Sequence, residues 1–150
     1  MEHLLFIDDE RFFARQYSRE LEPHYGVTIC RSVKDGIDIL NSGKAIDALI
    51  LDIQMPTPPG VADYETRDGV DTGLWALQTY RQQLVDRALP ILILTNRRPD
   101  EIEKRVHSLH FRSGQVEIFY KPDVSPVEFA RRLTTALRWW AQLGTKAEGK

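Results

Sequence analysis

Five short runs of apolar residues alternate with stretches of helical periodicity, and this alternation restricts the possible folds more than any other feature of the sequence. The runs are residues 4–7, 26–30, 48–51, 91–94 and 116–120. Strands that are apolar on both faces are typical of parallel sheets buried between layers of helices. The sequence therefore predicts a doubly wound α/β domain with a five-stranded parallel sheet.

The stretches around these runs predict five helices. They span residues 11–21, 33–40, about 71–87, about 99–110 and 125–143. In the first of them, Phe12 and Phe13 count toward the apolar face that should pack on the sheet. We expect one domain over residues 1–143 and a flexible tail over residues 144–150.

A long connection follows the third run. It covers residues 57–70, approximately, and contains prolines, glycines and acids without any periodicity. Connections between a strand and the next helix usually have about 2–6 residues. Loops of this excess length are typically functional or disordered, so we expect an inserted loop that begins close to the end of the third strand.

Composition argues against several classes of protein. The chain has 150 residues, of which 42% are apolar, and this is enough to bury a core. Its formal charge of −2 argues against a protein that holds nucleic acid through phosphate contacts. No apolar run approaches the roughly 20 residues of a membrane helix, and the N-terminus lacks the features of a signal peptide. We expect a cytoplasmic protein without direct nucleic-acid binding or membrane insertion.

Polar residues follow the predicted strands at the points where the strands end. Asp8 and Asp9 follow the first, Asp52 the third, Thr95 the fourth and Lys121 the fifth. Because parallel strands end at the same edge of a sheet, these side chains should converge. Three close carboxylates call for a cation such as Mg²⁺, whereas a hydroxyl and an ammonium suit the oxygens of a phosphoryl group. A carboxylate can itself be the nucleophile, and Asp52 is the best placed.

Four motifs at these strand ends resemble the signature of response-regulator receiver domains, the CheY-like phosphorelay domains of two-component signalling. The similarity covers about residues 4–143, and it implies a flavodoxin-like sheet with the strand order 2-1-3-4-5. The motifs are Ile7-Asp8-Asp9-Glu10, Leu51-Asp52-Ile53-Gln54-Met55-Pro56, Leu94-Thr95 and Lys121-Pro122.

This resemblance implies a phosphoacceptor and a metal site. Asp52 would accept a phosphoryl group from a histidine kinase, a phosphotransfer protein or a small phosphodonor. Mg²⁺ would be the cofactor. Its ligands would be Asp8, Asp9, Asp52 and the backbone carbonyl of Gln54.

The resemblance also assigns roles at the ends of the last two strands. Thr95 Oγ and Lys121 would bind phosphoryl oxygens. The Lys121–Pro122 bond would be cis, which is a minority state even before proline.

Some positions depart from the family pattern. Ile118 occupies the switch position, three residues before the lysine, where receivers usually carry an aromatic residue. Asn96 stands where a small residue usually follows the threonine. We expect Gln54, Asn96 and Arg97 to modulate access to Asp52.

These features predict a stand-alone receiver, without an output domain, that is phosphorylated on Asp52 and then changes a surface read by a downstream protein. Homodimerisation through that surface is a secondary hypothesis. We expect no enzymatic activity apart from the domain's own phosphotransfer. Two alternatives stay open: a phosphate-independent docking scaffold, and a metal-dependent phosphatase with Asp8 as nucleophile and Glu10 in place of its second aspartate.

Overall fold

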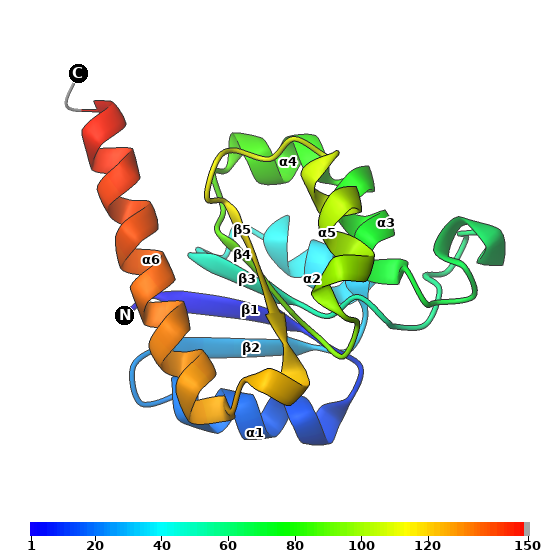
Figure 1. Ribbon diagram of the computed structural model, residues 1–150, viewed down its shortest axis with the longest axis horizontal. Helices are drawn as coiled ribbons and strands as arrows, with labels where there is room; N and C mark the ends of the chain where they lie inside the picture. The colour runs from blue at the N-terminus through cyan, green and yellow to red at the C-terminus, as the bar shows by residue number, and fades with distance from the viewer. Residues whose placement is uncertain (149–150) are drawn as a thin grey trace.

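The five apolar runs form one parallel sheet, as the sequence predicts. The computed structural model describes residues 1–148, and its strands lie in the predicted order β2-β1-β3-β4-β5 (Figure 1). Each of the four pairings between neighbouring strands is parallel. The strands are β1 (His3–Ile7), β2 (Gly26–Cys30), β3 (Ala48–Leu51), β4 (Ile91–Thr95) and β5 (Val116–Tyr120).

Six α-helices accompany the sheet within residues 1–148, which is one more than predicted. They are α1 (Arg11–Leu21), α2 (Val33–Leu40), α3 (Thr72–Thr79), α4 (Arg81–Asp86), α5 (Pro99–His107) and α6 (Pro126–Glu148), with short 3-10 helices η1 (Asp63–Thr66) and η2 (Lys121–Asp123). The predicted helix over residues 71–87 is divided at Tyr80, whose ψ of 16° is not helical. The Tyr80 ring packs edge-on against Trp75, with the centroids 6.2 Å apart. This contact between side chains five positions apart lies at the break, which the periodicity does not reveal.

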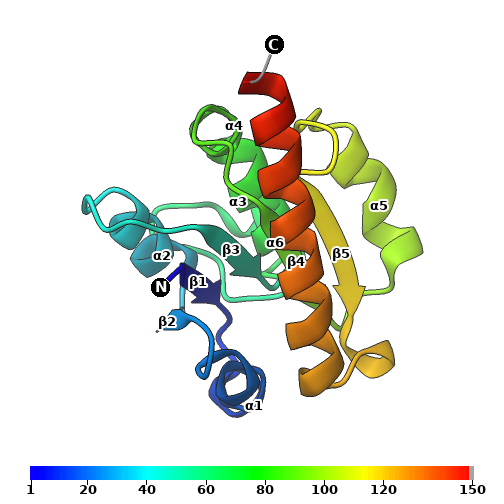
Figure 2. The ribbon, with the colours of Figure 1, turned by 90° about the vertical axis from the view of Figure 1, so that its left-hand side faces the viewer.

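Both faces of the central strands β1, β3 and β4 are buried, which explains why these strands are almost entirely apolar. In β1, Leu4 and Phe6 belong to the core cluster under α1 and α6. Leu5 and Ile7 belong to the cluster on the other face, under α2, α3, α4 and α5. Figure 2 shows α6 crossing one face of the sheet next to α1. Phe129 of α6 is fully buried there.

Helix α6 extends beyond the predicted boundary at residue 143 and continues to Glu148. A glycine in a helix costs only about 1 kcal/mol relative to alanine, so Gly144 is not enough to end it. Residues 149–150, the end of the expected tail, lie outside the described residues. No helix in the described part of the chain, α6 included, is long and apolar enough to cross a membrane.

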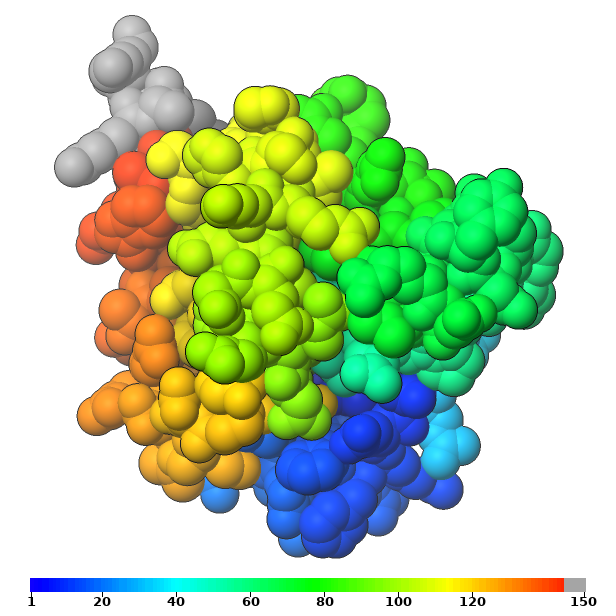
Figure 3. Space-filling view, turned by 45° about the vertical axis from the view of Figure 1, so that its right-hand side comes forward, coloured from blue at the N-terminus to red at the C-terminus, as the bar shows by residue number. Residues whose placement is uncertain are grey.

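The inserted loop over residues 57–70 has its own internal structure, and it projects from the body of the molecule beside α3 (Figure 3). Thr66 at the end of η1 is fully buried, and its hydroxyl contacts Thr57 Oγ1 at 2.7 Å. The same hydroxyl accepts the Gly69 N–H at 3.1 Å, while the Thr66 carbonyl accepts the Asp71 N–H at 2.8 Å. One buried threonine therefore ties both ends of the loop together.

Candidate functional site

The structure brings the polar residues of four strand ends into one site. Carboxylate oxygens of Asp8, Asp9 and Asp52 all lie within 4.8 Å of one another. Lys121 Nζ lies 3.0 Å from Asp8 Oδ2 and 3.4 Å from Asp52 Oδ2. Thr95 is the last residue of β4 and lines the same pocket as Asp52. The topology of a parallel sheet accounts for this convergence, because each of these residues ends or follows a strand.

The three carboxylates differ in depth. Asp8 is fully buried, and its two oxygens accept the Glu10 backbone N–H at 2.8 Å and the Lys121 ammonium. Asp52 Oδ1 accepts the Ile53 N–H at 2.7 Å, and its Oδ2 faces Lys121. Asp9 is half-buried at the surface of the site. Asp52 and Asp9 therefore reach the pocket, whereas Asp8 lies behind them.

The pocket above Asp52 has a volume of about 290 Å³ and is open to solvent. Gln54, Asn96 and Arg97, which the sequence places around the access route, all line it. Asp68 and Gly69 of the inserted loop line it too, and sequence reasoning did not assign them to the site. The signal that points to them is the position of the long loop directly after β3.

Burial and mutual repulsion set the protonation of these acids. The pKa of Asp52 is raised from 3.8 to about 6. Burial is the main cause and the charge of Asp8 adds to it, whereas the Lys121 ammonium and hydrogen bonds from Ile53 and Thr95 act in the opposite direction. The pKa of Asp9 is also raised, first by burial and then by Asp8. Such shifts are expected where carboxylates share a site without a bound cation.

The Lys121 ammonium is the cation that holds the site together. Burial alone would lower its pKa, but the charges of Asp52 and Asp8 outweigh burial, so the pKa is raised and the side chain stays charged. Its Nζ also lies 5.4 Å from the centroid of the Phe13 ring, a cation–π distance. Lys121 thus links β5 to the ends of β1 and β3.

The prediction that Phe12 and Phe13 belong to the buried face of α1 is wrong. Their exposed fractions are 72% and 39%, and the two rings meet edge to face with centroids 6.5 Å apart. Both lie in the first turn of α1, directly after the acidic residues 8–10 that follow β1. Helical spacing alone does not distinguish them from Tyr17 and Leu21, which are buried against α6 and the sheet.

Several solved receiver domains share this fold. The chain superposes on a CheY-like response regulator receiver domain from Methanospirillum hungatei JF-1 with a TM-score of 0.71 and 15% identity, covering 95% of this chain and 98% of that one. For the Vibrio cholerae chemotaxis protein CheY4 the TM-score is 0.69 at 20% identity, over 91% of this chain and 98% of that one. For a Sinorhizobium medicae response regulator receiver protein it is 0.64 at 24% identity, over 93% of each chain.

The chain has the receiver-domain fold. No family profile and no curated protein matches its sequence, so the likeness to receiver domains is carried by the structure. The roles proposed for individual residues rest on the geometry of the site.

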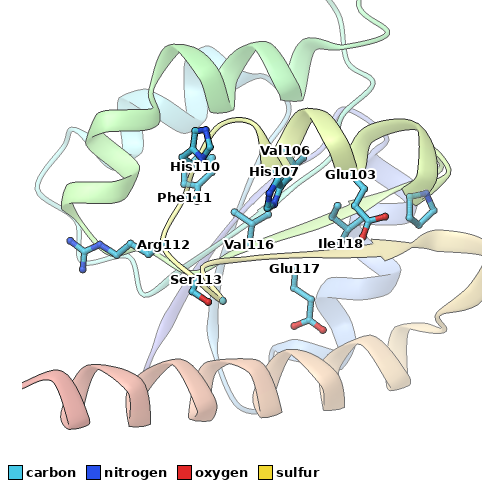
Figure 4. A pocket seen from close by; sticks show the side chains of 12 residues that line it. Glu103, Val106, His107, His110, Phe111, Arg112, Ser113, Val116, Glu117 and Ile118 are labelled. Carbon is cyan, nitrogen blue, oxygen red and sulfur yellow. The ribbon is translucent and has the colours of Figure 1, made fainter.

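Ile118, which the sequence predicts to occupy the switch position, faces away from the acidic site. It pairs with Ile93 in the sheet and packs against the core cluster under α5. Figure 4 shows Ile118 with Val106 and Val116 along a separate pocket of about 630 Å³ between α5 and β5. Its side chain has no polar atom, so it cannot form a hydrogen bond with Thr95.

The predicted cis bond before Pro122 is wrong. No peptide bond within residues 1–148 is cis, and the Lys121–Pro122 bond is trans. Residues Lys121–Asp123 form η2, and proline is well tolerated at the start of a helical turn. The trans bond is favoured by about 0.5–1 kcal/mol before proline, and from it Lys121 still reaches Asp8 and Asp52.

Gly73 brings α3 close to the phosphoacceptor candidate. Its N–H donates to the Ile53 carbonyl at 2.8 Å, and a Cβ at this position would lie 2.4 Å from the Asp52 carbonyl oxygen. Only a glycine lets the two backbones approach this closely.

Replacing Gly73 with alanine should therefore destabilise the domain by about 1–3 kcal/mol, because the backbones must separate to admit the Cβ. Urea unfolding followed by circular dichroism measures this. Gly144→Ala in α6 is the matched control, since nothing lies within 4 Å of its added Cβ, and we expect it to be neutral or slightly stabilising. Equal stability of Gly73→Ala and wild type would contradict the close approach.

Proposed function

We propose that the chain accepts a phosphoryl group on Asp52 and that Mg²⁺ assists this transfer. The observation that carries the proposal is the position of Asp52. Its carboxylate reaches an open pocket, lies within 4.8 Å of Asp8 and Asp9, and contacts Lys121. Thr95 lines the same pocket and offers a hydroxyl. A nucleophile, a set of oxygen ligands and two groups suited to phosphoryl oxygens are thus together.

The donor set fits a hard divalent cation. Asp8, Asp9, Asp52 and the backbone carbonyl of Gln54 would hold Mg²⁺, which prefers oxygen ligands and keeps several waters. A bound cation would neutralise the carboxylates and stabilise negative charge on the phosphoryl oxygens. Without it, Lys121 provides the nearest positive charge to Asp8 and Asp52.

Each step of the proposed transfer can be assigned to a side chain. With a pKa of about 6, Asp52 is mainly ionised at neutral pH. Its oxygen forms the new bond to phosphorus while the bond from phosphorus to the donor breaks, and the leaving group keeps that electron pair. Acetate leaves as the carboxylate, whereas a more basic leaving group such as an imidazole takes up a proton from solvent. The Thr95 hydroxyl donates to one phosphoryl oxygen. The Lys121 ammonium donates to another and gives up part of its contact with Asp52.

The burial of Asp8 argues against the phosphatase alternative. In that mechanism Asp8 would attack the substrate, but it is fully buried and both its oxygens are engaged by Glu10 N–H and Lys121. Asp52 is the more accessible nucleophile, since it lines the pocket.

We further propose a phosphohistidine-bearing protein, a histidine kinase or a phosphotransfer protein, as the natural donor. Exposed Phe12 and Phe13 stand beside the acidic site, and exposed aromatic residues are typical of protein interfaces. Phosphorylation would change a surface of the domain that a downstream protein binds. A second copy of the chain could also bind this surface.

The experiment that tests the proposed function is the mass of the intact protein after incubation with acetyl phosphate and Mg²⁺. We expect wild type to gain one phosphoryl group and Asp52→Asn to gain none, because asparagine keeps the shape but is not a nucleophile. Asp38→Asn is the matched control, since Asp38 is an exposed carboxylate on α2 and should not matter. An equal gain on Asp52→Asn, or no gain on folded wild type, would contradict the proposal.

A further inference from the structure

Asp71, at the junction of the inserted loop and α3, is a buried carboxylate surrounded by three arginines. Its side chain is 2% exposed. Its Oδ1 lies 2.9 Å from Arg97, and its Oδ2 lies 2.6 Å from Arg105 and 3.3 Å from Arg67. Burial alone would raise the pKa of Asp71, but Arg97 and Arg105 outweigh it and the pKa is lowered. We name these four residues the Asp71 cluster.

The Asp71 cluster joins parts of the chain that are far apart in sequence. Arg67 belongs to the inserted loop, Arg97 to the connection between β4 and α5, and Arg105 to α5. Arg97 also donates to the Val70 carbonyl at 2.9 Å and to Glu101 at 2.9 Å. A displacement of Arg97 would therefore act on the inserted loop and α5 together.

Arg97 is at the same time connected to the phosphoacceptor pocket. Its backbone N–H donates to Thr95 Oγ1 at 3.1 Å. Arg97 lines the pocket together with the loop residues Asp68 and Gly69. A short path of hydrogen bonds and ion pairs thus leads from Thr95 through Arg97 to Asp71.

We propose that the Arg97–Asp71 ion pair transmits phosphorylation of Asp52 to the inserted loop. As the Thr95 hydroxyl turns toward a phosphoryl oxygen, the Arg97 N–H must follow it or lose its acceptor. Either response displaces Arg97 relative to Asp71 and Val70, so the bonding of the loop changes. This inference rests on the proposed function and adds a route of regulation that does not use Ile118.

Ile118 does not provide a hydrogen-bonded route from Thr95. Ile118 packs on the α5 side of the sheet and has no group to bond with Thr95. By linkage, a ligand at Asp52 that alters the loop must itself be affected by the state of the loop. The Asp71 cluster should therefore influence how well the pocket holds a phosphoryl group.

Hydrogen exchange of the loop tests the proposal, with beryllofluoride and Mg²⁺ as the phosphoryl mimic. The amides of Gly69 and Asp71 report directly, since they bond to the Thr66 hydroxyl and carbonyl. At saturating mimic we expect exchange in residues 66–71 of the wild type to change by at least about fivefold. Binding of the mimic is measured separately by fluorine NMR for each protein.

Arg97→Gln separates coupling from binding. It removes the ion pair but leaves Asp71 with Arg105 and Arg67, so the buried carboxylate keeps partners. At saturating mimic, we expect its loop exchange no longer to respond. Arg98→Gln is the control, because Arg98 is exposed and pairs only with exposed Asp100 among the ion pairs of the described residues. It should respond as wild type does.

The outcomes distinguish a failure of the proposed coupling from a failure of the proposed phosphorylation of Asp52. A wild-type loop that does not respond while the mimic binds would overturn the coupling and leave the proposed function intact. A response of Arg97→Gln equal to that of wild type would overturn it as well. Failure of folded wild type to bind the mimic, together with no gain of mass from acetyl phosphate, would overturn both proposals.

Discussion

Lys121→Met should destabilise the domain by about 3–5 kcal/mol at pH 7 in the presence of a chelator, the usual cost of breaking a buried ion pair from one side. The Lys121 ammonium lies 3.0 Å from Asp8 and 3.4 Å from Asp52, and its side chain is 3% exposed. Methionine fills the space of the aliphatic stem without its charge. Two buried carboxylates are then left without a cation, which destabilises the folded state unless the carboxylates take up protons.

Urea unfolding of wild type and Lys121→Met measures this loss. Lys34→Met is the control: Lys34 contacts Asp38 at the same 3.0 Å, but its side chain is 62% exposed, so we expect little change. Millimolar Mg²⁺ should restore part of the stability of Lys121→Met, because a cation held by the acids replaces the missing ammonium. If the two lysine variants lost equal stability, the role of Lys121 at the site would be wrong.

When no divalent cation is present, the contribution of Asp52 to the free energy of unfolding should fall as the pH rises from about 4 to about 6. The pKa of Asp52 is raised from 3.8 to about 6, so the folded state binds this proton more tightly than the unfolded state does. A raised carboxyl pKa stabilises the fold below about pH 4, and this contribution is lost as the pH passes through 6. A shift of this size corresponds to about 3 kcal/mol.

The difference in unfolding free energy between Asp52→Asn and wild type isolates this contribution. Asparagine imitates the protonated acid, so the variant should gain about 3 kcal/mol relative to wild type across that window. Asp9, whose pKa is also raised, contributes with the same sign in both proteins. Mg²⁺ should stabilise wild type more at pH 7.5 than at pH 5, because it binds the ionised acids. A difference that stays constant with pH would contradict the raised pKa of Asp52.

The sheet and the composition of the site were predictable because both follow from local features of the sequence. A strand buried on both faces is apolar along almost its whole length, and β1, β3 and β4 are such strands. The outer strands β2 and β5 are half-buried. The side chains that end parallel strands meet at one edge whatever the loops between them do. Asp8, Asp52 and Lys121 could therefore be grouped before their distances were known.

Helical periodicity was less informative. It did not reveal the break at Tyr80, which lies where Tyr80 packs against Trp75. Nor did it show that Phe12 and Phe13 face solvent while Tyr17, one turn later, is buried and donates to the Val124 carbonyl. The difference lies in which partner covers each turn of the helix, and that partner comes from the other end of the chain.

By itself, the sequence determined the fold class, the strand order implied by its motifs and the set of residues at the strand ends. Only the tertiary structure decided which of these residues touch: Lys121 between Asp8 and Asp52, and Asp71 among arginines up to 34 positions away. It also decided that the bond before Pro122 is trans. The physical reason is that periodicity reflects neighbours within a turn or two. The environment of a charge depends instead on the low-dielectric packing of distant segments around it.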